Sequence, residues 1–439
     1  MTSRIAVVAS LILAVAGSSM AQTPAGNSSV VVPATASGGA LREWLDAFNS
    51  ADSAKLRAFY GRWRLARNVS TTLGFRRETG GFDLVSIERS EPRYIEFVVR
   101  ERNNADNRAL GIMEIAPGDT TLSQSYINII PPGLTTAAFR IDAATRTHVI
   151  DNAIAQLDTN YVFPEVATKM AARLRERAKQ GAYDAIESGP TFATRLTEDL
   201  QGVSHDRHLR VNFFPRVLPS RREDDGPPPD QRDREATTQS CAFVRTDTLP
   251  GNVGYLKFNG FNSADVCGEI ASRELDKLAN TTALIVDLRE NGGGDPAMVA
   301  HISSYLFDGR THLNDLWTRR TNRTEEFWTH EVQGPKFGGS KPIYVLTSSY
   351  TFSGAEEFTY NLKNLKRATI IGETTGGGAH PVDGHRIDDH FVIGVPFARA
   401  INPYSKTNWE GTGVTPDIRV PAAEALATAQ RMIAERARP

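Results

Sequence analysis

Between Asn252 and the C-terminus, short apolar runs typical of buried strands alternate with runs of helical periodicity. The strand-like runs are VGYLKF, ALIVDL, PIYVLT, ATIIGE and FVIGVPF. Helical runs lie between several of them, notably PAMVAHISSYLF and GAEEFTYNLKNL, and AAEALATAQRMIAERA closes the chain. Strands that alternate with helices favour a sheet with helices packed on its faces. The sequence therefore predicts an α/β core over residues 241–439.

A chain of 439 residues exceeds one ordinary core, so further domains are expected before this one. Leu41, Trp44 and Phe48 repeat at helical spacing, and β-type runs follow between residues 80 and 131. Helices followed by a run of strands predict a small α+β domain over residues 42–135. It loosely resembles the nuclear-transport-factor-like fold.

Amphipathic helical segments come next and predict a helical subdomain over residues 141–215. Residues 216–240 are charged, rich in proline and almost free of apolar side chains, which is typical of a solvated linker or flap.

The N-terminus has the pattern of an export signal. Arg4 precedes the apolar run 5–16, and Ser19 and Ala21 place small residues at a cleavage site. The run is too short to span a bilayer, so no stable membrane insertion is expected after the signal is removed. We predict a signal peptide over 1–21, a flexible leader over 22–41 and an exported, periplasmic or extracellular protein.

Composition excludes one class of partner. The chain is 40% hydrophobic and 23% charged, with a formal net charge of −1. Nucleic-acid binding needs a basic surface, and no such bias is present.

Export makes the two cysteines, Cys241 and Cys267, candidates for a disulfide, because oxidising compartments allow thiols to pair. The alternative is two buried thiols. No CxxC or clustered His/Cys pattern accompanies them, so neither a metal site nor a cofactor is predicted.

The segment TSSYTFSGAEEF, residues 347–358, leads from an apolar strand into a helix that begins just after Ser353. Free N–H groups at a helix N-terminus favour developing negative charge. This is the logic of a nucleophile elbow, although G-x-S-x-G is absent and a simple N-cap serine has the same local pattern. Gly354 leaves room for a substrate carbonyl, and its N–H can point at the carbonyl oxygen.

The segment LIVDLRENGGGDPAMV ends a strand in three glycines, Gly292, Gly293 and Gly294. Such a turn can cradle phosphate, supply an oxyanion-hole N–H or simply connect a strand to a helix. No Lys-Ser/Thr follows, so a Walker-type loop fits poorly. Elsewhere His205, His208 and Glu410 offer a base and an orienting acid, which completes the parts of a Ser-His-carboxylate site.

DLRENGGG, TSSYTFSGAEEF, GETTGGGAHP and NWEGTGVTPD together resemble the signature stretches of the tail-specific (C-terminal-processing) serine peptidases. The branch with tricorn and interphotoreceptor retinoid-binding protein is the most similar, over about residues 145–425. The resemblance implies a ClpP/crotonase-like ββα core preceded by a helical subdomain. It also implies peptide or unfolded protein as substrate.

Carried over residue by residue, the resemblance implies Ser353 as nucleophile, His208 of the D-x-H motif as base and Glu410 as the carboxylate that orients His208. Gly354 and Gly293 would form the oxyanion hole. His380, Gly292 and Gly294 would line the substrate site.

The chain departs from the family pattern in two ways. The region where a Ser-Lys dyad has its lysine reads ETTGGGAH and holds none. Too few residues separate His208 from Val253 for the family's PDZ domain.

Alternatives remain for both function and base. The same fold can carry apolar ligands without catalysis, and the same triad can hydrolyse esters. His380, Lys363 and Lys366 compete with His208 as base. A neutral histidine base predicts an acidic limb of the pH profile near the imidazole value of about 6.5.

Overall fold

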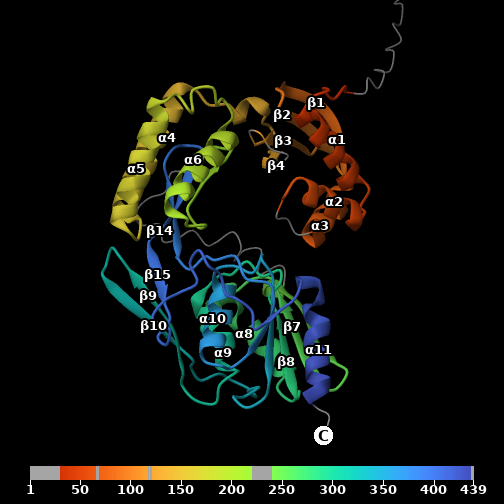
Figure 1. Ribbon diagram of the computed structural model, residues 1–439, viewed down its shortest axis with the longest axis vertical. Coiled ribbons are helices and arrows are strands. Elements are labelled where there is room, and N and C mark those ends of the chain that lie inside the picture. Colours follow the sequence, from red (N-terminus) through yellow and green to blue (C-terminus); the bar gives the residue numbers. More distant parts are fainter. Residues whose placement is uncertain (1–29, 66–68, 117, 119–120, 220–239, 437–439) are drawn as a thin grey trace, which may run out of the picture.

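The computed structural model describes residues 30–65, 69–116, 118, 121–219 and 240–436, which form three units (Figure 1). An N-terminal α+β domain and a helical subdomain lie at one end, and the α/β core lies at the other. The predicted signal peptide, residues 22–29 of the predicted leader and most of the predicted linker lie outside the described residues.

The N-terminal domain packs its helices on one antiparallel sheet of order β1-β2-β3-β4. Its first helix begins at Ala36, inside the predicted leader, because the Thr35 side chain accepts a hydrogen bond from the Gly38 N–H and caps it. Asp52 caps the second helix in the same way through the Ala54 N–H. The elements are α1 (Ala36–Asn49), α2 (Ser53–Arg62), α3 (Val69–Thr79), β1 (Phe82–Ser90), β2 (Tyr94–Glu101), β3 (Arg108–Ile115) and β4 (Leu122–Ile130).

The helical subdomain consists of three helices that bury a shared apolar cluster. Asp142 and Ser188 cap the first and third helices, and Pro164 occupies the first turn of the second. The elements are η1 (Thr136–Phe139), α4 (Ala143–Asn160), α5 (Pro164–Lys179), α6 (Gly189–Ser204) and the strand β5 (Arg210–Phe213).

The core contains a six-stranded sheet of order β16-β12-β11-β8-β7-β6, in which only the β6–β7 pair is antiparallel. Alternate residues of β8 face opposite sides, as strand geometry requires. Leu284 and Val286 join the cluster with α8, α9 and α10, whereas Ala283 and Ile285 pack against α11. The sheet elements are β6 (Phe243–Leu249), β7 (Val253–Phe258), β8 (Ala283–Asp287), β11 (Ile343–Thr347), β12 (Thr369–Gly372) and β16 (Ile418–Arg419).

Helices cover both faces of this sheet, as the alternation of patterns predicted (Figure 1). Four of the five strand-like runs of the sequence become β7, β8, β11 and β12. The fifth becomes β14, which leaves the central sheet. The core helices are α8 (Ala264–Asp276), α9 (Pro296–Ser304), α10 (Gly354–Asn364) and α11 (Ala425–Arg436), with short turns η2 (Ser240–Ala242) and η3 (Ala422–Glu424).

Two smaller sheets complete the core. β14 pairs with β13 on one side and with β5 of the helical subdomain on the other, so the subdomain and the core share a sheet. The other small sheet has the order β10-β9-β15. These strands are β9 (His312–Thr318), β10 (Arg323–Trp328), β13 (Val382–Arg386), β14 (Phe391–Pro396) and β15 (Ala398–Ile401).

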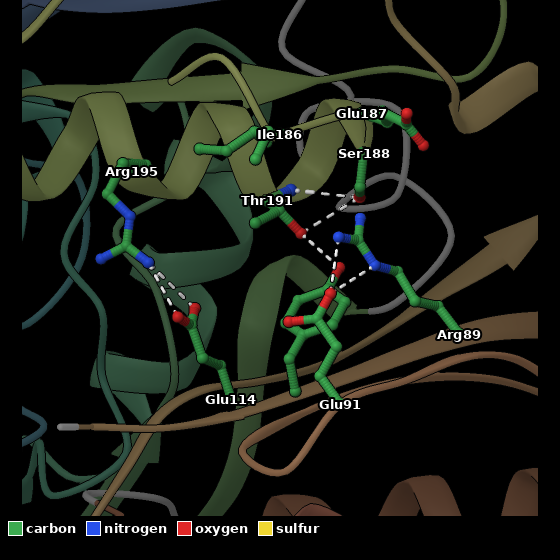
Figure 2. A pocket seen from close by; sticks show the side chains of 10 residues that line it. Arg89, Glu91, Glu114, Ile186, Glu187, Ser188, Thr191 and Arg195 are labelled. Carbon is green, nitrogen blue, oxygen red and sulfur yellow. Dashed lines mark hydrogen bonds and ion pairs between the residues drawn. The ribbon is translucent and has the colours of Figure 1, made fainter. Parts of the chain in front are cut away.

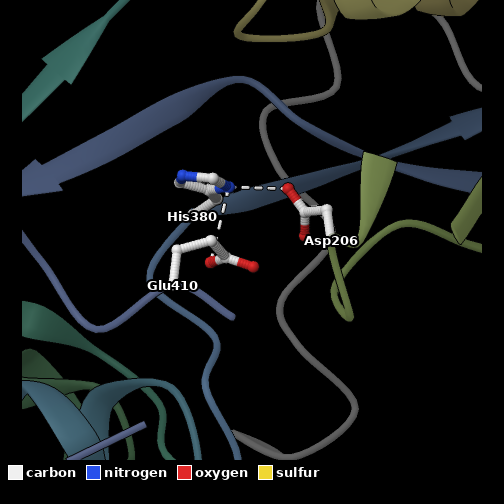
Figure 3. Close-up of side chains that lie close together, drawn as sticks. All are labelled: Asp206, His380 and Glu410. Carbon is white, nitrogen blue, oxygen red and sulfur yellow. Dashed lines mark hydrogen bonds and ion pairs between the residues drawn. The ribbon is translucent and has the colours of Figure 1, made fainter. Parts of the chain in front are cut away.

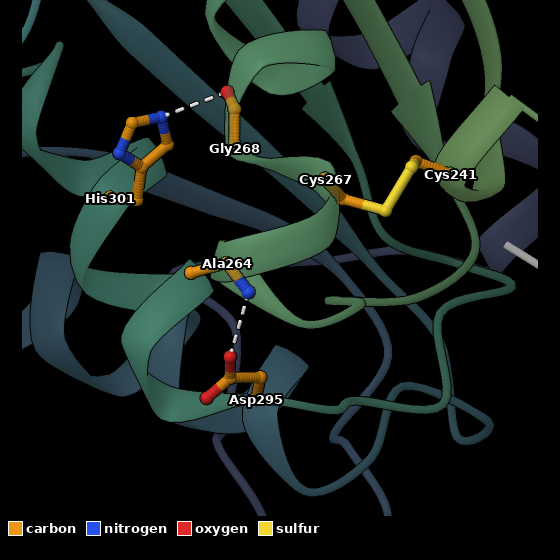
Figure 4. The surroundings of a disulfide bond; sticks show 6 residues. All are labelled: Cys241, Ala264, Cys267, Gly268, Asp295 and His301. Atoms are coloured by element: carbon orange, nitrogen blue, oxygen red, sulfur yellow. Dashed lines mark hydrogen bonds between the residues drawn. A yellow bond between two sulfur atoms is a disulfide. The ribbon is translucent and has the colours of Figure 1, made fainter. Parts of the chain in front are cut away.

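A disulfide ties the start of the core to α8. Cys241 and Cys267 are bonded, with Cα atoms 5.8 Å apart, which confirms the predicted pairing (Figure 4). Next to it, Asp295 accepts hydrogen bonds from the Ala264 N–H at the start of α8 and from the Ala297 N–H at the start of α9. One carboxylate therefore caps two adjacent helices.

The N-terminal domain meets the helical subdomain through polar contacts around a cavity of about 220 Å³ (Figure 2). Arg195 of α6 forms an ion pair with Glu114 of β3, in which the Arg195 Nη2 donates to both carboxylate oxygens, at 2.9 and 3.0 Å. The Thr191 hydroxyl lies 3.0 Å from the Tyr94 hydroxyl. The two units also share an apolar cluster, in which Phe139 and Phe213 pack with Val98, Leu110 and Ile112 of the sheet.

No helix in the described ranges combines the length and the apolar character needed to cross a membrane.

Candidate active site

The turn between β11 and α10 holds Ser353 in a rare backbone conformation. Its φ of 53° and ψ of −121° lie outside the regions that residues with a Cβ normally adopt. Such a residue costs on the order of 1–3 kcal/mol and persists only where its surroundings fix it. Here the Ser353 N–H donates to Glu356 Oε2 at 2.9 Å, and the Phe352 N–H donates to the Asn291 carbonyl at 3.1 Å. The backbone of Ser353 is thus strained at the strand-to-helix turn, which is the place of the strained residue in a nucleophile elbow.

The glycine turn after β8 packs against Ser353. A Cβ on Gly293 would lie 2.6 Å from the Gly354 nitrogen and 2.7 Å from the Ser353 Cβ, so only glycine fits. A Cβ on Gly294 would lie 1.9 Å from the Phe261 carbonyl oxygen. Gly293 and Gly294 therefore bring the backbone of one turn against the start of α10, whereas a Cβ on Gly292 would meet open space.

The amides of this turn differ in availability. The Gly293 N–H donates to Asn291 Oδ1 at 2.8 Å, and the Gly292 N–H donates to the Asn259 carbonyl at 3.3 Å. Among the described residues, none accepts a hydrogen bond from the N–H of Gly294 or of Gly354. Gly354 thus has the free amide expected of it, whereas the amide of Gly293 is engaged within its own turn.

His208 reaches this turn because β5 pairs with β14. The chain leaves α6 at His205, which adopts a left-handed conformation, and enters β5 two residues after His208. The His208 ring centroid lies 4.6 Å from that of Phe352, the residue before Ser353. His205, the other histidine of this motif, only ends the helix.

The environment of His208 keeps its imidazole neutral. Burial lowers the pKa of His208 to about 4, against the partial opposing effect of the Asp206 charge. Its Nδ1 is buried and has no hydrogen-bond partner among the described residues. A neutral imidazole is the state that a general base requires.

Asp206, His380 and Glu410 form a compact group next to His208 (Figure 3). Asp206 is fully buried, and its Oδ1 accepts a hydrogen bond from the backbone N–H of His208 at 3.0 Å. Its Oδ2 accepts a hydrogen bond from His380 Nδ1 at 2.6 Å and one from the Tyr161 hydroxyl at 3.3 Å. One carboxylate thus connects both histidines.

Glu410 lies beside His380. Its Oε2 is 3.4 Å from His380 Nδ1 and accepts the Ala379 N–H at 2.5 Å. No interaction joins Glu410 to His208 among the residues that the structure describes, so the predicted orienting contact is not made in this conformation. Glu410 instead fixes the loop that ends at His380.

The pKa values of Glu410 and His380 are both raised, for different reasons. Burial, together with the neighbouring Asp206 charge, raises the pKa of Glu410 to about 7. Burial would lower the pKa of His380, but its hydrogen bond with Asp206 and the charges of Asp206 and Glu410 raise it. The group therefore favours a protonated His380 that donates a hydrogen bond to Asp206.

The sequence led us to expect that His380 lines an open cleft, but the structure places it in the interior. Its exposed fraction is 4%, and its ring packs against the edge of Phe163 at 5.5 Å. The bond with buried Asp206 holds the ring inward.

Three ligand-type atoms of Asp206, His380 and Glu410 lie within 4.8 Å of one another, which is a spacing that a metal ion could use. The hydrogen bond between Asp206 and His380 already accounts for two of the three atoms, so the geometry is explained without an ion.

Sequence reasoning missed two residues that hold the site together. Glu356 is fully buried and accepts hydrogen bonds from the N–H groups of Ser353, Gly377 and Gly378, at 2.9, 2.6 and 2.8 Å, and from the Thr375 hydroxyl at 2.5 Å. The signal was present, because Ser353-x-x-Glu356 is the spacing of a capping box.

The second residue is Asp206, the first position of the D-x-H motif. Sequence alone showed it only as a neighbour of His208. Its contact with His380 links positions 174 residues apart, which no local pattern reveals.

Comparisons with known proteins agree on the class of this site. The model of "Peptidase family S41" matches residues 252–420, and that of the "N-terminal domain of Peptidase_S41 in eukaryotic IRBP" matches residues 140–246. Together they cover more than half of the chain and meet close to the linker between subdomain and core.

Curated relatives are similar over part of the chain. The carboxyl-terminal-processing peptidase 2 of Arabidopsis thaliana chloroplasts is 27% identical over 195 residues, which is 43% of this chain and 37% of that protein. The tail-specific protease of Haemophilus influenzae is 28% identical over 33% of this chain and 20% of its own length. The tricorn protease of Thermoplasma volcanium is 28% identical over 32% of this chain and 12% of its own length. The chain thus spans well under half the length of these relatives.

Proposed function

Because the chain belongs to peptidase family S41 and carries that family's IRBP-like N-terminal domain, we propose that it is a serine-type hydrolase that cleaves peptide bonds. The observation that carries the proposal is the strained backbone of Ser353 at the start of α10, between the free Gly354 amide and Phe352, against which the neutral ring of His208 packs. A serine with only a capping role has no need for this strain.

In the proposed reaction, His208 accepts the proton of the Ser353 hydroxyl while Oγ attacks the carbonyl carbon of the substrate. The resulting oxyanion accepts hydrogen bonds from the Gly354 N–H and from a second amide of the glycine turn. We propose Gly294 for this second amide in place of Gly293, because the Gly293 N–H already donates to Asn291.

His208 then donates its proton to the leaving amine, and the C–N bond breaks to leave an acyl-enzyme. Water repeats the sequence, with His208 as base, and releases the acyl group from Ser353. In each half of the reaction His208 first accepts a proton and then donates it, so it returns to its neutral form, which its low pKa favours.

Glu410 and Asp206 act as positioning residues in this proposal. Asp206 holds the backbone of His208, and Glu410 holds Ala379, the neighbour of Gly378. A Cβ on Gly378 would lie 2.6 Å from His208 Cε1, so the loop that Glu410 fixes forms one wall of the His208 ring. The third member of the triad thus acts through packing in this conformation.

We further propose that the protein is exported and that its core has the ClpP/crotonase-like ββα arrangement. The disulfide supports export, since such bonds persist mainly in oxidising compartments. Peptides or unfolded proteins would be the substrates, by analogy with the relatives named as processing and tail-specific proteases.

Covalent labelling tests the nucleophile directly. A fluorophosphonate probe should modify Ser353 in the intact protein, as mapped by mass spectrometry, and Ser353→Ala should abolish labelling. Ser349→Ala is the matched control, because Ser349 is an exposed serine in the same turn. Labelling that persists in Ser353→Ala would refute the proposal.

A further inference from the structure

The N-terminal domain contains a cavity of about 200 Å³ that belongs to no part of the proposed active site. Residues of α1, α2 and α3 form one side of it, and residues of β3 and β4 form the other. The sheet strands shift register at Leu84/Ser86, at Ile87/Arg89 and at Glu114/Ile115. Such bulges bend a sheet. Straight helices packed on a bent sheet leave space between the two layers.

Aromatic rings make up most of the cavity wall. Trp44 and Phe48 are stacked with ring centroids 5.3 Å apart, and Phe75 meets Phe48 at 5.8 Å. Phe48 and Met113 are each only 1% exposed, so the inner wall is fixed by the core of the domain. The cavity is therefore preformed, and its wall combines aromatic rings with polar atoms.

One end of the cavity is polar. The hydroxyls of Tyr60 and Thr72, both in the wall, lie 2.7 Å apart. A tyrosine hydroxyl has one donor and two acceptor positions, of which the contact with Thr72 uses one. Ser125 lies in the wall directly across from Met113 in the β3–β4 pair. A ligand with one hydrogen-bonding group would thus find a partner at Tyr60.

We propose that this cavity binds a single aromatic ring that carries one hydroxyl or similar hydrogen-bonding group, as in a phenol. An apolar cavity of about 150 Å³ accommodates benzene, so 200 Å³ holds one ring with a few further atoms. Offset and edge contacts with Trp44, Phe48 and Phe75 favour an aromatic ring over an aliphatic group of equal size. Leaving a cavity of this size empty destabilises a domain, which favours its use.

Two sources could present this chemistry: a free small molecule, or the tyrosine side chain of a peptide. The proposal concerns the ring and its hydroxyl, which both sources share, and the inference stands independently of the peptidase activity.

Calorimetric titration of the full chain with p-cresol tests the site. We expect a dissociation constant of about 0.1–1 mM, since a ligand of this size gains limited binding energy. Ser125→Leu fills the cavity and should abolish binding, whereas Ser123→Leu makes the same change at an exposed position of the same strand and should not. Circular dichroism and thermal melting establish that both variants are folded.

The Tyr60→Phe variant separates the contribution of the hydrogen bond at the polar end from that of the ring contacts. It should weaken p-cresol binding by about 3- to 10-fold and leave toluene binding unchanged, because only the hydrogen bond is lost. No binding of p-cresol or toluene at millimolar concentration to the wild-type chain would overturn the proposal. Binding that survives in folded Ser125→Leu would place the ligand elsewhere and also overturn it.

Displacement of p-cresol by N-acetyl-tyrosine amide distinguishes the sources. Competition assigns the cavity to a tyrosine side chain within a peptide, and its absence assigns the cavity to a free phenolic molecule.

Discussion

Two neighbouring glutamates of α10 allow a test of how hydrogen-bond partners change the effect of a buried carboxyl group on stability. Glu356 and Glu357 are 0% and 4% exposed. The Glu356 carboxylate accepts four hydrogen bonds, whereas Glu357 Oε1 has no partner among the described residues. Burial raises the pKa of Glu357 from 4.5 to about 8. We predict that replacing Glu357 by glutamine stabilises the protein near pH 7.

The magnitude follows from proton linkage. Between pH 4.5 and about 8 the folded chain keeps the Glu357 proton that the unfolded chain releases, so stability falls as the pH rises through this window. Each pH unit costs about 1.4 kcal/mol, which gives about 3 kcal/mol near pH 7. Glu357→Gln resembles the protonated side chain in shape and has no such loss. Below the unfolded pKa the two proteins should be equally stable.

Glu356→Gln is the matched control and should have the opposite effect. The side-chain NH₂ group of glutamine would replace one of the two carboxylate oxygens. In place of Oε2 it would face the N–H donors of Ser353 and Gly378, and in place of Oε1 it would face the N–H donor of Gly377. Leaving buried donors unpaired costs about 1–3 kcal/mol each. This variant should therefore be destabilised and should also lose activity, because Glu356 holds the turn of Ser353.

Thermal melting at pH 4.5 and near pH 7 measures both variants. For the α/β core, 3 kcal/mol corresponds to an increase in Tm of about 6–12 °C for Glu357→Gln near neutral pH, with no increase at the acidic pH. An unchanged Tm for Glu357→Gln at both pH values would show that Glu357 is ionised and partnered in the fold, and the reasoning would be refuted.

Three further predictions concern the site and the disulfide. His208→Ala should lower kcat/KM for a peptide substrate on the order of 10⁴-fold and His380→Ala by less, and the reverse ranking would make His380 the base. The pH profile of kcat/KM should rise through a limb near pH 4, because burial lowers the pKa of His208 to about 4, and a limb near 6.5 would indicate a solvated imidazole instead. Reduction of the Cys241–Cys267 bond, which closes a loop of 26 positions, should lower stability by about 3–4 kcal/mol in urea unfolding, and an unchanged midpoint would show that the bond constrains nothing.

Local patterns in the sequence determined the class of the fold and the nucleophile turn. Period-2 and helical apolar runs depend only on residues a few positions apart, so the strands β7, β8, β11 and β12 and the helices α9 and α10 could be predicted. The strand-to-helix turn at Ser353 followed for the same reason, since the end of a strand and the start of a helix are both local features. The proposal of Ser353 as nucleophile rested in addition on the family resemblance. The disulfide needed only two cysteines and an exported chain.

Tertiary structure decided how distant residues meet. The pairing of β5 with β14 brings the His208 ring against Phe352, the residue before Ser353, and the shared Asp206 carboxylate turns His380 inward, away from the cleft predicted for it. Glu410 contacts the loop before His380 instead of His208 for the same reason. The Gly293 amide is engaged by Asn291, and the aromatic cavity arises from strand bulges and three separate helices. Each of these outcomes depends on distances between segments that are far apart in sequence, and side-chain periodicity carries no information about such distances.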